Sequence, residues 1–202
     1  MEPVQGIAGA KPLGRDYLLR ARELTERHGT LLIFDEVQCG MGRTGQPFAA
    51  QLYGVTPDIL TTAKGLAGGF PAGAVLLSEQ VASSVRLGDL GTTFGGGPLA
   101  CALMEAVIDT ILEDELLENV RDLSRLIRDS CHLGPVREIR GEGFLLGLDV
   151  GDQAGRVRSE LLGRGIVVGG SNDPRIVRLL PPLILEATHV DRLAGALEEI
   201  GE

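Results

Sequence analysis

Lys64 stands out in this sequence because both its residue type and its surroundings suit covalent chemistry. It follows segment 58–63, which has the composition of a buried strand, and it precedes the glycine-rich segment 65–69. Arginine supplies most of the positive charge, since Lys11 is the one other lysine among the 19 Lys and Arg residues. A deprotonated lysine amine can attack a carbonyl carbon, whereas arginine keeps its proton in proteins. Lys64 is therefore a candidate nucleophile, and the alternative is a surface lysine beside a turn.

Asp35 is a second candidate, because it ends another apolar run, Leu31–Phe34. A continuous apolar run is typical of a parallel strand that is buried on both faces. Glu36 and Gln38 follow on either side of Val37, so the end of this strand carries two carboxylates and an amide. Ligands commonly bind at the carboxyl ends of parallel strands. The alternative for Asp35 is a carboxylate that caps a helix or forms an ion pair.

Thr92 and Thr93 form a third candidate within the glycine-rich segment 91–97. Glycines let backbone amides approach an anion, and hydroxyls add donors, so a phosphate site is reasonable here. The same interval of 29 residues separates Asp35 from Lys64 and Lys64 from Thr93. We expect the acid, the amine and the hydroxyl loop to reach one edge of a sheet and to meet at one ligand. The alternative for the loop is an interdomain hinge.

Helices and strands are expected to alternate around these residues. Residues 16–28 predict a helix that turns Leu18, Leu19, Ala21 and Leu24 inward. Three strands are then expected in apolar runs, at residues 31–34, 59–62 and 72–77. A helix followed by strands in this order favours a mostly parallel sheet.

The second half of the chain has a different pattern. Helical spacing of apolar residues predicts two long helices, one from Pro98 and one near 116–127, and proline suits the first turn of a helix. Short strands and helices then alternate, with strands near residues 136–139, 144–150, 166–168 and 176–180 and helices near 157–162 and 190–200. The predicted fold class is therefore α/β, with a large-domain part over residues 1–111 and a smaller α/β domain over residues 112–202.

Composition excludes several classes of function. A chain of 202 residues with 44% hydrophobic and 23% charged residues is expected to be globular with a substantial core. The net charge of −9 argues against nucleic acid as a partner, because phosphate binding needs a basic surface. No apolar run approaches the roughly 18 residues of a membrane span, so we expect a cytoplasmic protein without a membrane partner. Reduced thiols and no metal site are expected from three widely spaced cysteines, Cys39, Cys101 and Cys131.

Three motifs in this sequence resemble those of a known family. They are Phe34–Gly45, Thr62–Gly65 and Thr92–Ala100, in this order and at matching intervals. Together they resemble the signatures of class III, pyridoxal-phosphate-dependent aminotransferases, with the greatest similarity to the acetylornithine and ornithine aminotransferase group. The resemblance extends from Glu2–Gly6 to Arg178–Leu183, which is nearly the whole chain. It implies the C-terminal part of the mostly parallel major domain of such an enzyme, followed by its small domain.

The resemblance also implies roles around a pyridoxal 5′-phosphate cofactor. Lys64 would bind the cofactor aldehyde covalently and then move the proton of the substrate, which a permanently charged arginine could not do. Asp35 would pair with the pyridine nitrogen and keep it protonated. Gln38 would donate a hydrogen bond to the phenolic oxygen, and Val37 would pack against one face of the ring.

Further implied contacts involve substrate and a second subunit. Thr93 would bind the cofactor phosphate of the other subunit in a homodimer, and Thr92 lies where family members contact substrate. Arg178 matches the arginine that binds the substrate carboxylate, for which a planar guanidinium with two donors is suited. The alternative for Arg178 is a role in domain packing.

Two features depart from the family pattern. Family members are usually much longer, which implies that this chain begins within the large domain. Ile7 stands where ornithine and γ-aminobutyrate aminotransferases often carry a glutamate that pairs with the arginine matched by Arg178.

The predicted function is transfer of an amino group from an amino acid or ω-amino donor, acetylornithine-like, to 2-oxoglutarate. The alternatives are a non-catalytic fragment, or a related aminomutase, epimerase or decarboxylase.

Overall fold

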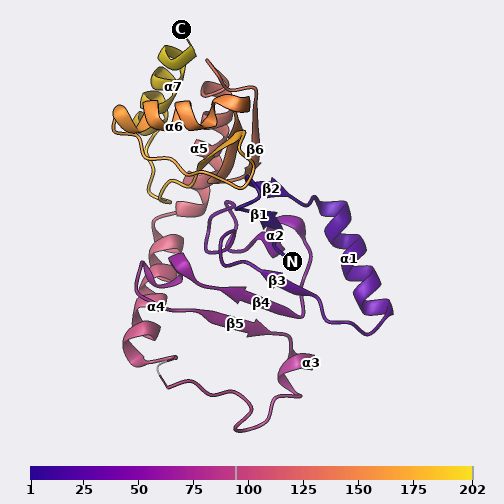
Figure 1. Ribbon diagram of the computed structural model, residues 1–202. Coiled ribbons are helices and arrows are strands. Elements are labelled where there is room, and N and C mark those ends of the chain that lie inside the picture. The colour runs from indigo at the N-terminus through magenta and orange to yellow at the C-terminus, as the bar shows by residue number, and fades with distance from the viewer. Residues whose placement is uncertain (94, 202) are drawn as a thin grey trace.

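The computed structural model describes residues 1–93 and 95–201, so Phe94 of the third motif lies outside the described residues. Besides the two-stranded pair β1-β2, two three-stranded sheets lie in different parts of the molecule, with α4 and α5 running from one part to the other (Figure 1). The elements are β1 Val4–Gln5, β2 Lys11–Pro12, α1 Arg15–Arg27, β3 Ile33–Asp35, α2 Ala49–Tyr53, β4 Ile59–Thr62, the 3-10 helix η1 Lys64–Ala67, β5 Ala74–Leu77, α3 Glu79–Ala82, α4 Pro98–Glu113, α5 Leu116–Ser130, β6 Glu138–Glu142, β7 Leu145–Asp149, the 3-10 helix η2 Gly151–Gln153, α6 Ala154–Gly163, β8 Ile176–Leu179 and α7 Ala187–Gly201.

The first sheet has the strand order β3-β4-β5. Strands β3 and β4 are parallel, and Asp35 is the register partner of Thr61. Strand β5 runs antiparallel to β4, with Ala74 opposite Thr62. The carboxyl ends of β3 and β4 therefore lie at one edge of this sheet, and β5 ends at the opposite edge.

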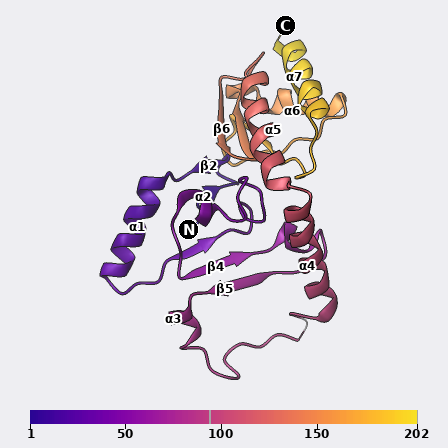
Figure 2. The same ribbon diagram turned by 180° about the vertical axis from the view of Figure 1, so that it is seen from behind.

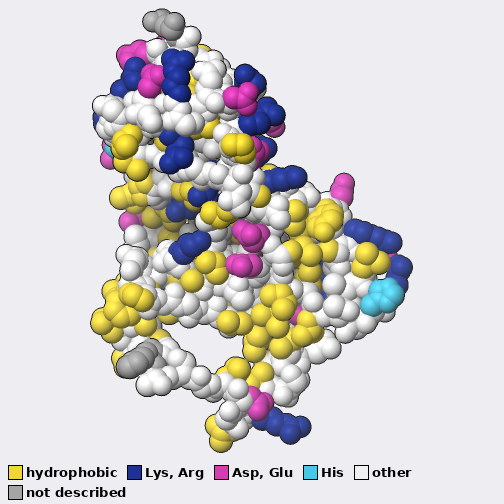
Figure 3. Space-filling view, in the orientation of Figure 1, with side chains coloured by type: hydrophobic (Ala, Val, Ile, Leu, Met, Phe, Trp, Pro, Cys, Tyr) yellow, Lys and Arg dark blue, Asp and Glu magenta, His cyan; other side chains and the backbone are white. Residues whose placement is uncertain are grey.

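One face of β3 and β4 is packed, and the opposite face of the sheet is exposed within the described chain. Phe34 and Leu60 are buried, whereas Ile33 and Val75 keep 44% and 60% of their exposure. Hydrophobic side chains accordingly gather on the surface over this sheet (Figure 3). The prediction that the run Leu31–Phe34 is covered on both faces is wrong for the described chain, because no described segment covers the face that carries Leu31 and Ile33.

Helix α1 confirms the predicted helix to within one residue, but its packing differs from the prediction. Leu18 is the residue of α1 that is buried, and Leu19 and Leu24 are each 37% exposed. Helices α1 and α4 lie at opposite sides of the first sheet in both views (Figures 1 and 2). Helix α1 therefore contributes a narrow stripe of buried side chains to the core, rather than the wide apolar face that its sequence predicted.

The two predicted long helices are present as α4 and α5. Pro98 is at the first position of α4, where its missing N–H costs nothing. Glu115 has a left-handed backbone with φ of 52° and separates the two helices. Helix α5 buries Leu116, Val120, Leu123, Ser124 and Ile127, and three of these, Val120, Leu123 and Ile127, belong to the core cluster that includes residues of the second sheet.

The second sheet, β6-β7-β8, is antiparallel throughout. All five residues of β7 are buried, which makes this strand the centre of the larger core. The strand expected near residues 166–168 is absent, and this region makes instead an isolated bridge from Gly169 to Arg178. Among the described residues, no helix has the length and apolar character needed to cross a bilayer.

Buried apolar residues form two clusters. One takes its members from residues 4–55 together with Leu145, and the other spans residues 120–200. The predicted boundary between residues 111 and 112 falls in the last turn of α4, and this division stays a prediction.

Several hydrogen bonds join the two parts of the chain. Arg43 donates a hydrogen bond to the carbonyl of Pro181, and its own carbonyl accepts from the amide of Phe144 at 2.8 Å. Arg140 donates to the carbonyl of Gly9 at 2.7 Å. These bonds hold segments from both halves of the sequence together.

Candidate active site

Asp35 and Lys64 lie at the same edge of the first sheet. Asp35 is the last residue of β3, level with Thr61, and Lys64 follows the parallel strand β4 after one intervening residue. Both side chains are exposed, and Asp35 Oδ1 accepts a hydrogen bond from the amide of Val37 at 3.1 Å. The sequence prediction that strand ends bring this acid and this amine to one edge is confirmed.

Lys64 has an unusual backbone conformation. Its φ is 51°, and it opens the 3-10 helix η1 directly after the extended residue Ala63. Non-glycine residues rarely adopt this left-handed region, and such outliers cluster at functional sites. The abrupt turn ends β4 and leaves the Lys64 side chain exposed at the sheet edge.

Glu36 holds the turn that follows Asp35. Its side chain is fully buried, and its carboxylate accepts hydrogen bonds from the amides of Ala49 and Ala50 at 2.5 and 2.7 Å. Burial raises the pKa of Glu36. The hydrogen bonds from the amides of Ala50 and Ala49 lower it, and the effect of Ala50 is the larger of the two. Sequence reasoning missed this anchoring role, because residues 36 and 49 come together through the fold alone.

Gln38 and Arg178 contact each other although 140 positions separate them in the sequence. Arg178 Nη1 donates to Gln38 Oε1 at 3.3 Å, and Arg178 Nε donates to the carbonyl of Gly170. Burial lowers the pKa of Arg178. Gly6 adjoins this pair, because a Cβ atom built on it would lie 1.3 Å from Gln38 Oε1. Gly6 is a second residue that sequence reasoning missed as part of the site.

Val37 is half-buried in the turn between Asp35 and Gln38. The turn thus carries a carboxylate, an apolar side chain and an amide in succession, and Lys64 lies at the next strand end. This set can bind a carbonyl compound covalently, pair with a protonated ring nitrogen and donate a hydrogen bond to an oxyanion.

Thr92 and Thr93 do not reach this edge in the way that the equal intervals predicted. The strand before them, β5, is antiparallel and ends at the opposite edge, so the prediction of three successive junctions on one edge is wrong. Both threonines are exposed, and the segment that carries them runs outside the sheet between α3 and α4 (Figure 1). Thr92 Oγ1 accepts a hydrogen bond from the amide of Gly95 at 3.2 Å.

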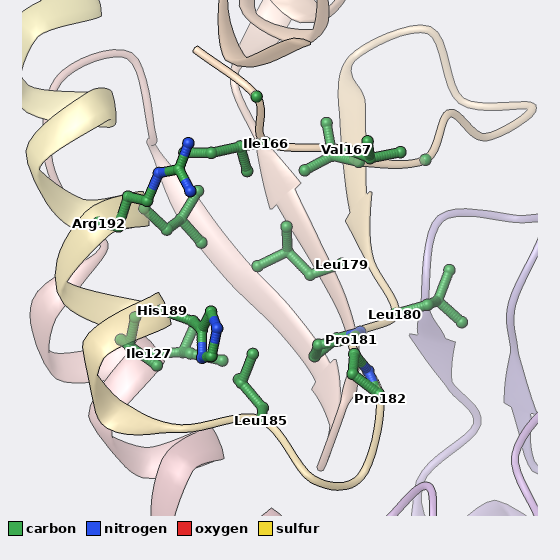
Figure 4. Close-up of a pocket in the computed structure, with 15 residues that line it drawn as sticks. Ile127, Ile166, Val167, Leu179, Leu180, Pro181, Pro182, Leu185, His189 and Arg192 are labelled. Atoms are coloured by element: carbon green, nitrogen blue, oxygen red, sulfur yellow. The ribbon is translucent and has the colours of Figure 1, made fainter.

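An apolar cavity of about 480 Å³ lies elsewhere, in the part that contains the second sheet (Figure 4). Its walls include Ile127, Leu179 and Leu185. The two basic side chains in its wall have partners already, since His189 Nδ1 accepts from the amide of Glu186 and Arg192 donates to the carbonyl of Arg164. The cavity contains none of the predicted site residues, so the candidate site is the sheet edge.

The chain is similar to known aminotransferases over nearly its whole length. The family model described as aminotransferase class-III matches residues 1–200. An acetylornithine aminotransferase of Methanocaldococcus jannaschii is 43% identical over 208 residues, which cover 99% of this chain and 51% of the relative. An acetylornithine aminotransferase of Mesorhizobium japonicum is 43% identical over 189 residues, which cover 91% of this chain and 47% of the relative. The chain thus spans about half the length of the curated relatives it matches.

Solved structures give the same result for the fold. The crystal structure of acetylornithine aminotransferase from Elizabethkingia anophelis superposes with a TM-score of 0.90 at 31% identity, over 98% of this chain and 55% of that one. The ornithine aminotransferase of Toxoplasma gondii gives a TM-score of 0.90 at 30% identity, over 99% of this chain and 50% of that one. Both neighbours contain the arrangement of helices and strands described above.

Proposed function

The chain belongs to the class-III aminotransferase family, and from this membership we propose that the protein transfers amino groups with pyridoxal 5′-phosphate as its cofactor. The observation that carries the proposal is the sheet edge at which Asp35, Lys64 and the pair Gln38–Arg178 occur together. Bound pyridoxal 5′-phosphate supplies an aldehyde and an electron-withdrawing ring. The residues present fit this group, because they offer an exposed amine, an exposed carboxylate and an amide donor.

Each residue has a defined task in this proposal. Lys64 Nζ would hold the cofactor, and once the substrate amine has displaced it, the free amine would carry the proton from the substrate Cα to the cofactor C4′, which requires a group that can lose its own proton. Asp35 accepts the hydrogen bond of the protonated pyridine nitrogen and stabilises that charge. Gln38 donates to the phenolic oxygen, and Val37 packs against the ring.

The proposed substrates are an acetylornithine-like amino donor and 2-oxoglutarate as the acceptor. Support comes from the relatives, which are named acetylornithine aminotransferases. Arg178 is proposed to bind the substrate carboxylate, because its present partners are the neutral oxygens of Gln38 and Gly170. A carboxylate forms stronger, charge-assisted hydrogen bonds with a guanidinium than neutral oxygens do.

We further propose a homodimer and a division into two domains. Thr93 would bind the phosphate of the cofactor in the other subunit, and Thr92 would lie beside the substrate there. Support for this is the exposed position of both threonines on a segment outside the sheet. Residues 1–111 would belong to the large cofactor-binding domain and residues 112–202 to the small domain.

The proposal is tested by trapping the cofactor on the protein. The protein is incubated with pyridoxal 5′-phosphate, reduced with borohydride and digested, and the labelled peptide is identified by mass spectrometry. We expect the label on Lys64, its loss in Lys64→Ala and its retention in Lys11→Ala, which removes the other lysine. A label that is absent, or that follows Lys11, refutes the cofactor assignment. Assays of amine transfer to 2-oxoglutarate then separate an aminotransferase from an aminomutase, epimerase or decarboxylase.

A further inference from the structure

The side-chain amide of Gln38 can take one orientation only. Arg178 Nη1 approaches one end of this amide at 3.3 Å, and a guanidinium has donors but no acceptor. The end that faces Arg178 must therefore be the carbonyl oxygen, which removes the usual ambiguity between oxygen and nitrogen in a glutamine. The Nε2 group remains free to donate to another acceptor.

Gly6 keeps the space that this amide occupies. A Cβ atom on residue 6 would lie 1.3 Å from Gln38 Oε1 and 2.4 Å from Gln38 Cδ, distances at which something must move. Gly6 is not among the residues with positive φ, so backbone conformation does not require glycine here. A larger residue at position 6 would therefore displace the end of the flexible Gln38 side chain.

Arg178 itself is held from its other side. Its Nε donates to the carbonyl of Gly170, and its backbone pairs with Gly169 through two hydrogen bonds of 2.8 and 2.9 Å. In the described part of the chain, no carboxylate forms an ion pair with Arg178, so the contact to Gln38 is not in competition with one. The residue beside Gly6 is Ile7, whose side chain cannot supply such a carboxylate.

We propose that Gly6 and Arg178 are positioning residues for Gln38, which keep its Nε2 free to donate to the phenolic oxygen of bound pyridoxal 5′-phosphate. This inference rests on the proposed function, since it assigns a task to residues around the same cofactor. Gly6 acts by leaving space, and Arg178 acts by fixing which end of the amide is the acceptor. Two positions far apart in the sequence thereby adjust the electronic state of one cofactor atom through Gln38.

The test measures the absorbance of the cofactor-loaded protein against pH without substrate. A hydrogen bond to the phenolic oxygen stabilises its negative charge, so its loss raises the midpoint pH of the absorbance change by about one unit. We expect this rise in Gln38→Ala, in Gly6→Ala and in Arg178→Met. The matched control is Arg175→Met, because Arg175 precedes the same strand but pairs with Asp149. This control should keep the midpoint of the unmodified protein.

Double variants separate positioning from other effects. In a Gln38→Ala background, Gly6→Ala and Arg178→Met should cause no further rise, because the group on which they act is gone. A further rise with Arg178→Met would mean that its charge acts directly on the cofactor, and this would overturn the proposal for Arg178. A further rise with Gly6→Ala would overturn it for Gly6 in the same way.

Borohydride trapping on Lys64 accompanies every measurement, so that the two proposals fail separately. No label on Lys64 in the unmodified protein refutes the proposed function and this inference together. A label on Lys64 with an unchanged midpoint in both Gly6→Ala and Arg178→Met refutes this inference alone. Circular dichroism shows that each variant is folded, and a Gly6→Ala protein that is unfolded leaves Arg178→Met to decide the outcome.

Discussion

Gly143→Ala should weaken the backbone contacts that join the two parts of the chain. Gly143 has a φ of 54°, and a Cβ atom there would lie 2.4 Å from the carbonyl oxygen of Arg43 and 2.7 Å from the backbone of Thr44. A left-handed backbone costs a non-glycine residue about 1–2 kcal/mol. The collision also displaces the Arg43 carbonyl, which accepts from the Phe144 amide at 2.8 Å, and loss of that bond costs about 1 kcal/mol or more. The expected loss in free energy of unfolding is therefore about 2–4 kcal/mol.

Urea unfolding measures this loss, and Gly155→Ala is the matched control. Gly155 lies within α6, has no positive φ, and has nothing within 4 Å of its added Cβ. Since alanine favours a helix over glycine by about 1 kcal/mol, this control should gain stability or stay unchanged. If the two substitutions shift the urea midpoint equally, or if Gly143→Ala changes stability by less than about 0.5 kcal/mol, the close contact between Gly143 and Arg43 is refuted.

Three further predictions concern Asp35, Asp58 and the cysteines. Asp35→Ala should keep the borohydride-trapped label on the active lysine and lose nearly all amine transfer, and unchanged turnover would remove Asp35 from its proposed pairing with the ring nitrogen. The amide of Leu32 lowers the pKa of Asp58 in the folded protein. This carboxylate therefore stabilises the fold above its unfolded pKa of about 4, and the stabilisation is lost as the pH falls through the lower folded pKa. Asp58→Asn should therefore flatten the acid limb of a plot of unfolding free energy against pH, and an unaltered limb would contradict this. Burial raises the pKa of Cys39 to about 12, so iodoacetamide should label exposed Cys101 in the folded protein and Cys39 only after unfolding, as peptide mass spectrometry would show.

Local sequence patterns predicted the edge that carries the acid and the amine. Apolar runs that end in Asp35 and before Lys64 are strands β3 and β4, and their parallel pairing follows from the crossover that links them. Pro98 likewise predicted the start of α4. These features depend on residues close in sequence, so that periodicity and turn residues are sufficient to find them.

Contacts between distant segments could not be predicted in the same way. The direction of β5 decides at which edge of the sheet that strand ends, and equal sequence intervals carry no information about strand direction. The contact of Gln38 with Arg178, and the space that Gly6 leaves for it, arise where both ends of the chain meet. Nothing in the sequence around Gly6 or Gln38 indicates that this glycine leaves space for that glutamine.

Asp35 and Glu36 show how adjacent carboxylates acquire different tasks from the strand that carries them. Asp35 is exposed at the sheet edge, whereas Glu36 is fully buried and caps α2 through the amides of Ala49 and Ala50. Side chains alternate between the faces of a strand, so a shift of one residue in register would bury Asp35 and expose Glu36. Such a shift would leave the two amides of α2 without their acceptor, which costs free energy because buried donors require partners. The buried carboxylate therefore fixes the register that keeps the neighbouring carboxylate available for chemistry.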